Sequence, residues 1–322
     1  MALSSSSAFR MLHGIFAVYK PPGMKWKSIR DTVEMKLLQE LNSLQQPPPR
    51  QKILFLPQNT DNSSGGELTK VVTSVPVLAD HVLVKGPRFT YLKVGVGHKL
   101  DTKSSGVFVL GIGNGNKLLT DMYEKHYTKD YTVSGMFGKA TDDFSDVGKV
   151  IEKTTYKHIT RERLEQVLAM LQGANRKAML MHSHVDLKSQ EAYEMAVQGT
   201  LRPMVKSPPL VLGLRCTAFS PPSFTLEIQC MHETQQYLRK LVHEVGLELR
   251  SSAVCTKVRR IRDGPFTLDC ALTHGHWDLN SITNAIKECR PIATELCKDG
   301  AGLTWEKLDE EDALDIEGRN LQ

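Results

Sequence analysis

The sequence predicts a mixed α+β fold. Segments with strand-like and helix-like spacing intermingle along the chain, without the regular βαβ alternation that a doubly wound parallel sheet requires. Apolar residues make up 40% of the 322 residues and charged residues 24%, so a packed core is feasible and general disorder is not expected. No run approaches the roughly 18 apolar residues of a membrane span, which argues against an integral membrane protein.

The first part of the chain predicts a strand, a helix and an insertion. Ile15 to Tyr19 is a short apolar run that Pro21-Pro22-Gly23 stops, which predicts a strand followed by a turn. Apolar residues at helical spacing over residues 29–41 predict a helix, with Ser28 as its N-cap. Residues 45–67 are rich in Pro, Gln, Asn, Ser and Gly and predict a flexible insertion, because element-like sequence resumes soon afterwards.

The rest of the chain predicts further strands and helices in irregular order. Thr160 is expected to cap a helix over residues 161–171, which Gly173 ends. Ser220-Pro221-Pro222-Ser223 is expected to join two paired strands, and Asp263-Gly264 to form a turn. The predicted strands are residues 107–112, 131–137, 210–218, 224–230 and 254–261, and the other predicted helices are residues 115–126, 191–198 and 235–249. Two helices and an acidic tail are expected after Ala271.

Charge is unevenly distributed along the chain. The formal net charge is +5, and the segment from Glu306 to the end carries seven acids and two bases. Without this acidic end, the remaining chain therefore carries +10. A body of that charge suits a polyanion such as a nucleic acid, although a basic protein without such a partner is an equally open interpretation.

The N-terminus has the composition of a targeting sequence. Residues 1–30 contain no acid, five bases and a run of four serines. This composition is typical of a mitochondrial targeting segment, which we expect at residues 1–13 because the first predicted strand follows directly. A disordered cytosolic end is the alternative.

Most of the common catalytic and binding motifs are missing from the sequence. The six cysteines are widely spaced with no C-x-x-C pair, which indicates reduced thiols rather than a disulfide framework or a zinc site. No G-x-G-x-x-G, P-loop, H-E-x-x-H or G-x-S-x-G motif occurs. What remains is Asp101 in a loop, Tyr131 at the start of a strand and Arg239 on a helix. A loop aspartate taken alone more often forms a turn. With the other two residues, the alternative is a site in which an arginine fixes a carboxylate and a tyrosine stacks on a planar substrate.

Several ordered motifs then carry a resemblance to a known family. The chain opens with Gly14-Ile15-Phe16-Ala17-Val18-Tyr19-Lys20-Pro21-Pro22-Gly23, and its centre reads Lys93-Val94-Gly95-Val96-Gly97-His98-Lys99-Leu100-Asp101 followed by Ser105-Gly106-Val107-Phe108-Val109-Leu110. Later come Lys129-Asp130-Tyr131, Gly138-Lys139-Ala140-Thr141-Asp142, Tyr237-Leu238-Arg239-Lys240-Leu241 and Val258-Arg259-Arg260. From about Gly14 to Thr273 the chain resembles the TruB family of tRNA pseudouridine synthases, and within it the animal mitochondrial branch.

The resemblance implies a fold, an activity and roles for residues. It implies a catalytic domain over residues 14–273 built on a largely antiparallel sheet, followed by a helical extension and acidic tail over residues 274–322. Asp101 falls on the family's essential aspartate, Tyr131 on the tyrosine that stacks on the target base, and Arg239 on the arginine that pairs with the aspartate. The implied reaction converts uridine in RNA to pseudouridine and needs neither metal nor cofactor. The residues expected to contact RNA are Lys20, Lys93, His98, Lys99, Lys129, Asp142, Arg259 and Arg260.

Two positions depart from the family pattern. Val96 replaces the family's histidine, with a different histidine at His98, and Asp186 stands where a lysine is expected. Both changes affect RNA-contact motifs, and the RNA-binding PUA domain usual in bacterial members is also not expected. We therefore expect altered RNA recognition with the chemistry retained, on mitochondrial mRNA in preference to tRNA T-loops, in the mitochondrial matrix. The alternative is an RNA chaperone or mitochondrial ribosome assembly factor that acts independently of catalysis. The expected partners are mitochondrial mRNA or tRNA, with rRNA and mitochondrial RNA-processing or ribosome-assembly proteins as further candidates.

Overall fold

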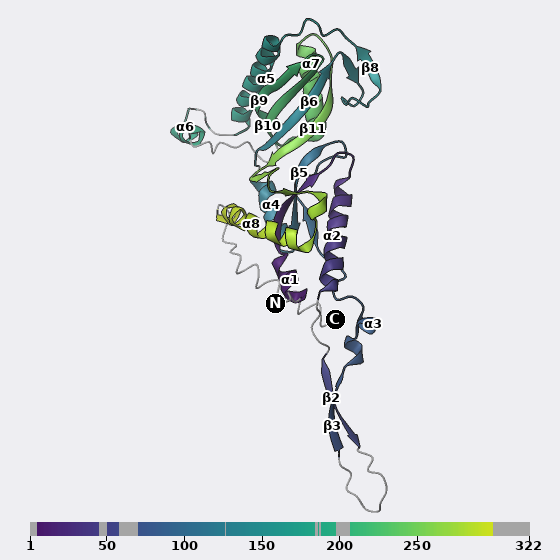
Figure 1. The fold of residues 1–322 in the computed structure, drawn as a ribbon. Coiled ribbons are helices and arrows are strands. Elements are labelled where there is room, and N and C mark those ends of the chain that lie inside the picture. Colours follow the sequence, from purple (N-terminus) through teal and green to yellow (C-terminus); the bar gives the residue numbers. More distant parts are fainter. Residues whose placement is uncertain are drawn as a thin grey trace, which may run out of the picture.

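The computed structural model describes residues 5–44, 50–57, 70–125, 127–183, 186, 188–197 and 207–298. Within them, one sheet of nine strands runs through the body of the molecule, with helices along it (Figure 1). The strand order is β13-β1-β5-β11-β6-β10-β9, with β12 beside β11 and β4 beside β5. The β1–β13 and β5–β11 pairs are parallel and the other pairs are antiparallel. The predicted mixed α+β fold with a largely antiparallel sheet is confirmed. In the described part of the chain, no helix is both long and apolar enough to span a bilayer.

One half of the sheet is built on β1 (Gly14–Lys20) and β5 (Ser105–Ile112). Each is a nearly continuous buried apolar run, as expected for strands covered on both faces. The helices α2 (Trp26–Ser43), α4 (Gly115–Glu124) and α8 (Leu279–Lys298) belong to this half. Helix α2 begins two residues before the predicted N-cap, so Ser28 lies inside it, and its carbonyl accepts from Thr32 Oγ1.

The other half is built on β6 (Lys129–Phe137), β9 (Leu210–Ser220), β10 (Ser223–Met231) and β11 (Ala253–Asp263). Helix α5 (Arg161–His182) lies along β9 and α7 (Gln235–Glu248) along β11. Thr160 caps α5 as predicted, but the helix runs through Gly173. A helix interior tolerates one glycine at a cost of about 1 kcal/mol, and the good helix formers Ala174, Arg176 and Lys177 follow it.

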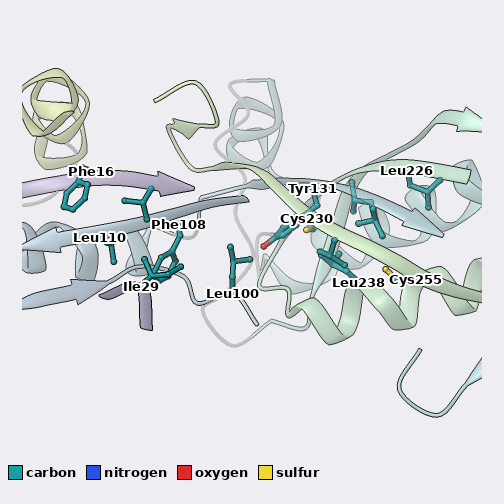
Figure 2. Close-up of a cluster of buried hydrophobic side chains, with 14 of the residues drawn as sticks. Phe16, Ile29, Leu100, Phe108, Leu110, Tyr131, Leu226, Cys230, Leu238 and Cys255 are labelled. Atoms are coloured by element: carbon teal, nitrogen blue, oxygen red, sulfur yellow. The ribbon is translucent and has the colours of Figure 1, made fainter. Parts of the chain in front are cut away.

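The two halves meet where β5 pairs with β11. That pairing covers only Ser105 with Arg259 and Gly106 with Arg260. Gly106 has a φ of +118°, and a Cβ there would lie 2.0 Å from the Arg260 carbonyl oxygen, so no other residue fits this crossing. The apolar core is nevertheless continuous, and Figure 2 shows Leu100 between the Phe108 side and the Tyr131 side of the junction.

One strand of a projecting hairpin lies in the predicted insertion. β2 (Gln51–Pro57) and β3 (Lys70–Pro76) form an antiparallel hairpin that projects from the body (Figure 1), followed by η1 (Leu78–Asp80) and α3 (Val82–Lys85). The strand over residues 51–57 was not expected from the sequence, although its Ile-Leu-Phe-Leu run favours a strand. The rest of the predicted insertion, residues 45–49 and 58–67, lies outside the described residues.

The ends of the domain add smaller elements. Helix α1 (Ser5–Met11) falls in the predicted targeting segment, and its Ala8 is buried, as is Leu12 just after it. After β11 come β12 (Phe266–Thr267), β13 (Ala271–Leu272) and η2 (His274–His276), so within the described residues one long helix, α8, follows Ala271, where two were expected. The acidic tail lies outside the described residues. The remaining elements are β4 (Val94–Val96), β7 (Lys139–Thr141), β8 (Val150–Lys153) and α6 (Gln190–Val197).

Candidate active site

Asp101 and Arg239 meet at the junction of the two half-sheets. Asp101 lies in the loop between β4 and β5, directly after the buried Leu100, which anchors the loop in the core. Arg239 comes from the second turn of α7, and its Nη2 donates to Asp101 Oδ2 at 2.6 Å. The other carboxylate oxygen accepts the backbone N–H of Ser104 at 2.8 Å. The pairing expected from the sequence is present in the geometry.

The surroundings keep Asp101 ionised. Partial burial acts to raise the pKa of this carboxyl, but the hydrogen bond from Ser104 and the ion pair with Arg239 outweigh it, so the pKa lies below its ordinary value. The carboxylate side chain keeps 30% of its surface exposed. It is therefore an ionised group that a substrate can reach.

Lys20 holds the Asp101 loop in place. Its side chain is fully buried, and its Nζ donates to the carbonyl oxygen of Ser104 at 2.7 Å and to that of Pro21 at 3.2 Å. Burial lowers the pKa of Lys20 to about 8, against the opposing attraction of Asp101. The expected contact of Lys20 with phosphate has no accessible surface in this structure, because the ammonium group is used to hold the Asp101 loop.

A pocket of about 300 Å³ adjoins the Asp101 loop. Gln235, at the start of α7, lines it and accepts the backbone N–H of Asp101 at 3.3 Å. The pocket volume is at the lower end of the range for small-molecule sites, which suits one nucleoside rather than a longer ligand. The other lining residues are His98, Lys99, Tyr123, Lys129, Glu233 and Arg260.

Tyr131 lies behind this pocket in a buried acid–base cluster. Its hydroxyl donates to Glu233 Oε1 at 2.6 Å, and Lys129 Nζ lies 3.2 Å from the same oxygen. All three side chains are almost fully buried. Burial, reinforced by the neighbouring Glu233 carboxylate, raises the pKa of Tyr131 well above its ordinary value, so the hydroxyl stays protonated. The ring of Tyr131 has no exposed surface, and stacking on a base would require a covering side chain to move.

Arg260 belongs to the same buried cluster and links it to Asp263 and His98. Its guanidinium is fully buried and donates to the carbonyl oxygens of Val107 (2.9 Å) and His98 (2.7 Å), with Asp263 at 3.4 Å. Asp263 also contacts His98 Nδ1 at 3.1 Å. Desolvation acts to raise the pKa of Asp263, but Arg260 and His98 lower it to about 2. Arg260 is thus a structural cation in this structure, and it offers no surface to a phosphate.

The remaining predicted RNA contacts are scattered. Lys93 and Lys99 are exposed, and Lys99 Nζ lies 5.1 Å from the centre of the Trp26 ring, which Lys27 and Arg30 also approach. Arg259 lies over Tyr19, partly buried. Asp142 is exposed and accepts the backbone N–H of Lys149 in the turn between β7 and β8, so its carboxylate shapes that turn.

Sequence reasoning missed the partners that define the pocket. Glu233 follows β10 and lies opposite Lys129 and Tyr131, because β10 pairs with β6 and places Cys230 against Lys129. Two side chains at alternate positions of one strand point to the same face, so the Lys-x-Tyr spacing was the available signal for a shared acidic partner. Nothing in the local sequence indicated that Gln235 and Tyr123 would line this pocket, or that Asp263 would pair with Arg260.

Comparisons with known proteins identify the family of the chain. The model of the TruB family pseudouridylate synthase N-terminal domain matches residues 87–236, which include Asp101, Tyr131 and Glu233. The protein named "Pseudouridylate synthase TRUB2, mitochondrial" from Xenopus tropicalis is 70% identical over 290 residues, covering 90% of this chain and 89% of that protein. The protein of the same name from Homo sapiens is 58% identical over 305 residues, covering 94% of this chain and 92% of that protein. "Pseudouridylate synthase TRUB1" from Mus musculus is 34% identical over 228 residues, covering 70% of this chain and 64% of that protein.

Proposed function

The chain belongs to the TruB family of pseudouridine synthases, which isomerise uridine in RNA to pseudouridine, and we propose that it acts on uridines of mitochondrial mRNA with Asp101 as its nucleophile. The observation that carries the proposal is the 2.6 Å ion pair between Asp101 and Arg239 beside a nucleoside-sized pocket. The isomerisation breaks the bond from C1′ to N1, turns the uracil and forms a bond from C1′ to C5. A positioned carboxylate suits this chemistry in type.

The geometry supports separate roles for Arg239 and Asp101. Arg239 holds Asp101 ionised and oriented, so that the carboxylate attacks C1′ or takes the 2′ proton. The second terminal nitrogen of Arg239, Nη1, is buried and has no protein partner among the described residues, which leaves a donor for a substrate oxygen. The target uridine must leave its stack to reach Asp101, at a cost of a few kcal/mol.

Phosphate contacts offset that cost. The exposed cations Lys27, Arg30 and Lys99 surround Trp26 next to the pocket, and Lys99 is part of the pocket wall. Such contacts give affinity without reading sequence. We assign phosphate binding to this group in place of the buried Lys20 and Arg260, and we keep Lys93 and Arg259 as further candidates.

The preference for mRNA rests on the two departures from the family pattern. Val96 ends β4 and packs against the core, so it offers no hydrogen bond to RNA. Asp186 is exposed and accepts the backbone N–H of Lys188 at 3.0 Å just before α6, and its negative charge disfavours phosphate where a lysine is expected. Both changes remove contacts that would favour one fixed tRNA loop.

We place the enzyme in the mitochondrial matrix, in line with the names of its relatives. Removal of residues 1–13 would delete α1 and open the core around Ala8 and Leu12. Residues 1–13 therefore act as a targeting sequence that is not cleaved after import. A fusion of residues 1–30 to a fluorescent reporter should enter mitochondria, and a diffuse cytosolic signal would contradict the N-terminal targeting sequence.

Pseudouridine mapping of mitochondrial RNA tests the main proposal. Null cells should be rescued with the wild type, with Asp101→Asn and with the half-buried control Asp121→Asn on α4. We expect sites to vanish in the null, to return with wild type and control, and to stay absent with Asp101→Asn. Sites confined to tRNA would contradict the mRNA assignment. Full rescue of respiratory growth by Asp101→Asn would favour the RNA chaperone or assembly factor.

A further inference from the structure

We propose that Glu233 is the base that removes the C5 proton in the last step of the isomerisation, an assignment that rests on the proposed function. The step is required by the chemistry. Once C5 has bonded to C1′, it still carries its hydrogen, and the ring regains conjugation only when that proton leaves and a proton binds N1. The C5 proton passes to the Glu233 carboxylate, the C–H electron pair returns to the ring, and water supplies the proton at N1.

The position of Glu233 suits this role. It lines the pocket beside Asp101, and Gln235, two residues further on, bonds the Asp101 backbone. Tyr131 donates to Oε1 at 2.6 Å and Lys129 lies 3.2 Å from it, Oε2 accepts from Lys129 at 3.4 Å, and the Cys230 thiol also bonds to the carboxylate. These donors orient the carboxylate, whose side chain is 1% exposed at the pocket wall, so that C5 must press against this wall to pass its proton on.

The other groups at the pocket suit the step less well. Asp101 is committed to Arg239 and to the ribose. The Tyr131 hydroxyl donates a hydrogen bond to Glu233, and the raised pKa of Tyr131 keeps it protonated. Tyr131 therefore positions the base rather than acting as one. His98 turns Nδ1 to the buried Asp263, and its ring packs against Tyr123 with the centroids 4.5 Å apart. A carboxylate held in a fixed orientation inside the pocket is what remains.

Substitution of the C5 hydrogen isolates the step. RNA containing 5-fluorouridine at a mapped target has no C5 proton to lose, so its rearrangement to the C-glycoside reports only the earlier bond changes. Single-turnover rates should be measured on the full chain with uridine, 5-deuteriouridine and 5-fluorouridine RNAs. For Glu233→Gln we expect a 10²–10⁴-fold slower formation of pseudouridine, as is typical for loss of a general base. We also expect a new deuterium isotope effect, and a rate on the fluorinated RNA within roughly twofold of wild type.

Matched variants separate this proposal from the one it rests on. Asp101→Asn should lose activity on all three RNAs, and its retention of activity would overturn the nucleophile assignment instead. Glu227→Gln removes a carboxylate of β10 that pairs with Arg215 of β9, outside the pocket, and should match wild type throughout. Glu233→Asp keeps a carboxylate and should recover part of the rate if Glu233→Gln folds poorly.

Several results would overturn the assignment of Glu233. One is an equal loss on the fluorinated and natural RNAs in Glu233→Gln, which is the signature of a structural role. Unchanged rates on all three RNAs would be equally damaging. Selective loss on the natural RNA in His98→Gln, with Glu233→Gln unaffected, would transfer the role to His98.

Discussion

The Asp101–Arg239 pair beside the pocket, which we call the open wall, and the acid–base network that lines the pocket, which we call the covered wall, are built in different ways. On one side, Asp101 and Arg239 form an ion pair from a loop and a helix, and the carboxylate keeps 30% of its surface exposed. On the other side, Lys129, Glu233 and Arg260 belong to a network on and beside the strands β6, β10 and β11 that is almost entirely covered. The first wall can meet a substrate without rearrangement, whereas the second is fixed in shape and charge before the substrate arrives.

This difference determines how much unfolding free energy is lost when one charged partner is removed. A buried ion pair is weak evidence of stability, because desolvation consumes most of the attraction, yet removal of one partner leaves an uncompensated charge. An ion pair that water can reach loses little when broken. Variants of Arg260, the structural cation of the covered wall, should therefore act mainly on folding, and variants of the open wall mainly on activity.

The largest effect on stability is expected for Arg260→Met. It leaves Asp263 buried without its cation and frees the carbonyl oxygens of Val107 and His98. Loss of a partner from a buried pair costs about 3–5 kcal/mol of unfolding free energy. Urea unfolding at pH 7 measures it. The neighbour Arg262 on the same strand pairs with Asp130 in a partly exposed position, and Arg262→Met should cost less unfolding free energy than Arg260→Met because water can reach the groups that it leaves. Equal losses in the two variants would contradict the contrast between covered and open pairs.

A smaller, pH-dependent effect is expected for Lys20. Its pKa in the folded protein is about 8, below the ordinary value of 10.5, so between these pH values the unfolded chain binds more protons. The wild type should therefore gain stability relative to Lys20→Met as the pH rises from 8 to 10.5. Each unit of pKa shift corresponds to 1.36 kcal/mol, which limits the gain to about 3 kcal/mol. Denaturant unfolding of both proteins across this range tests the effect, and parallel stability curves would show that Lys20 is not desolvated as the structure indicates.

The residues of the open wall could be predicted from the sequence, whereas the partners within the covered wall could not. Asp101 and Arg239 were identified from motif residues, and most strands followed from apolar runs such as Val107 to Ile112. The covered wall depends on the pairing of β6 with β10 and β11, which joins residues about 100 positions apart, such as Tyr131 and Glu233. No local pattern encodes such partners. For the same reason Lys20 and Arg260 were expected to contact phosphate: a basic residue in a motif looks alike whether it faces RNA or a buried carbonyl.

The smallest effect on stability is expected for Arg239→Met, which belongs to the open wall. The Arg239 side chain is 13% exposed and that of Asp101 30%, and Asp101 keeps its bond to Ser104, so the variant should lose clearly less unfolding free energy than Arg260→Met. Its activity should fall strongly at every pH, because Arg239 orients the nucleophile. The pKa of Asp101 lies below its ordinary value partly because of Arg239, so removal of Arg239 raises it. The acid limb of the rate profile should then move to higher pH, since a carboxyl with a higher pKa loses its charge earlier as the pH falls. Single-turnover rates from pH 4 to 8 measure this shift, with Lys240→Met on the next, exposed position of α7 as the control. An unshifted acid limb would mean that Ser104 alone holds Asp101 ionised, and a loss of stability as large as that of Arg260→Met would remove the distinction between the two walls.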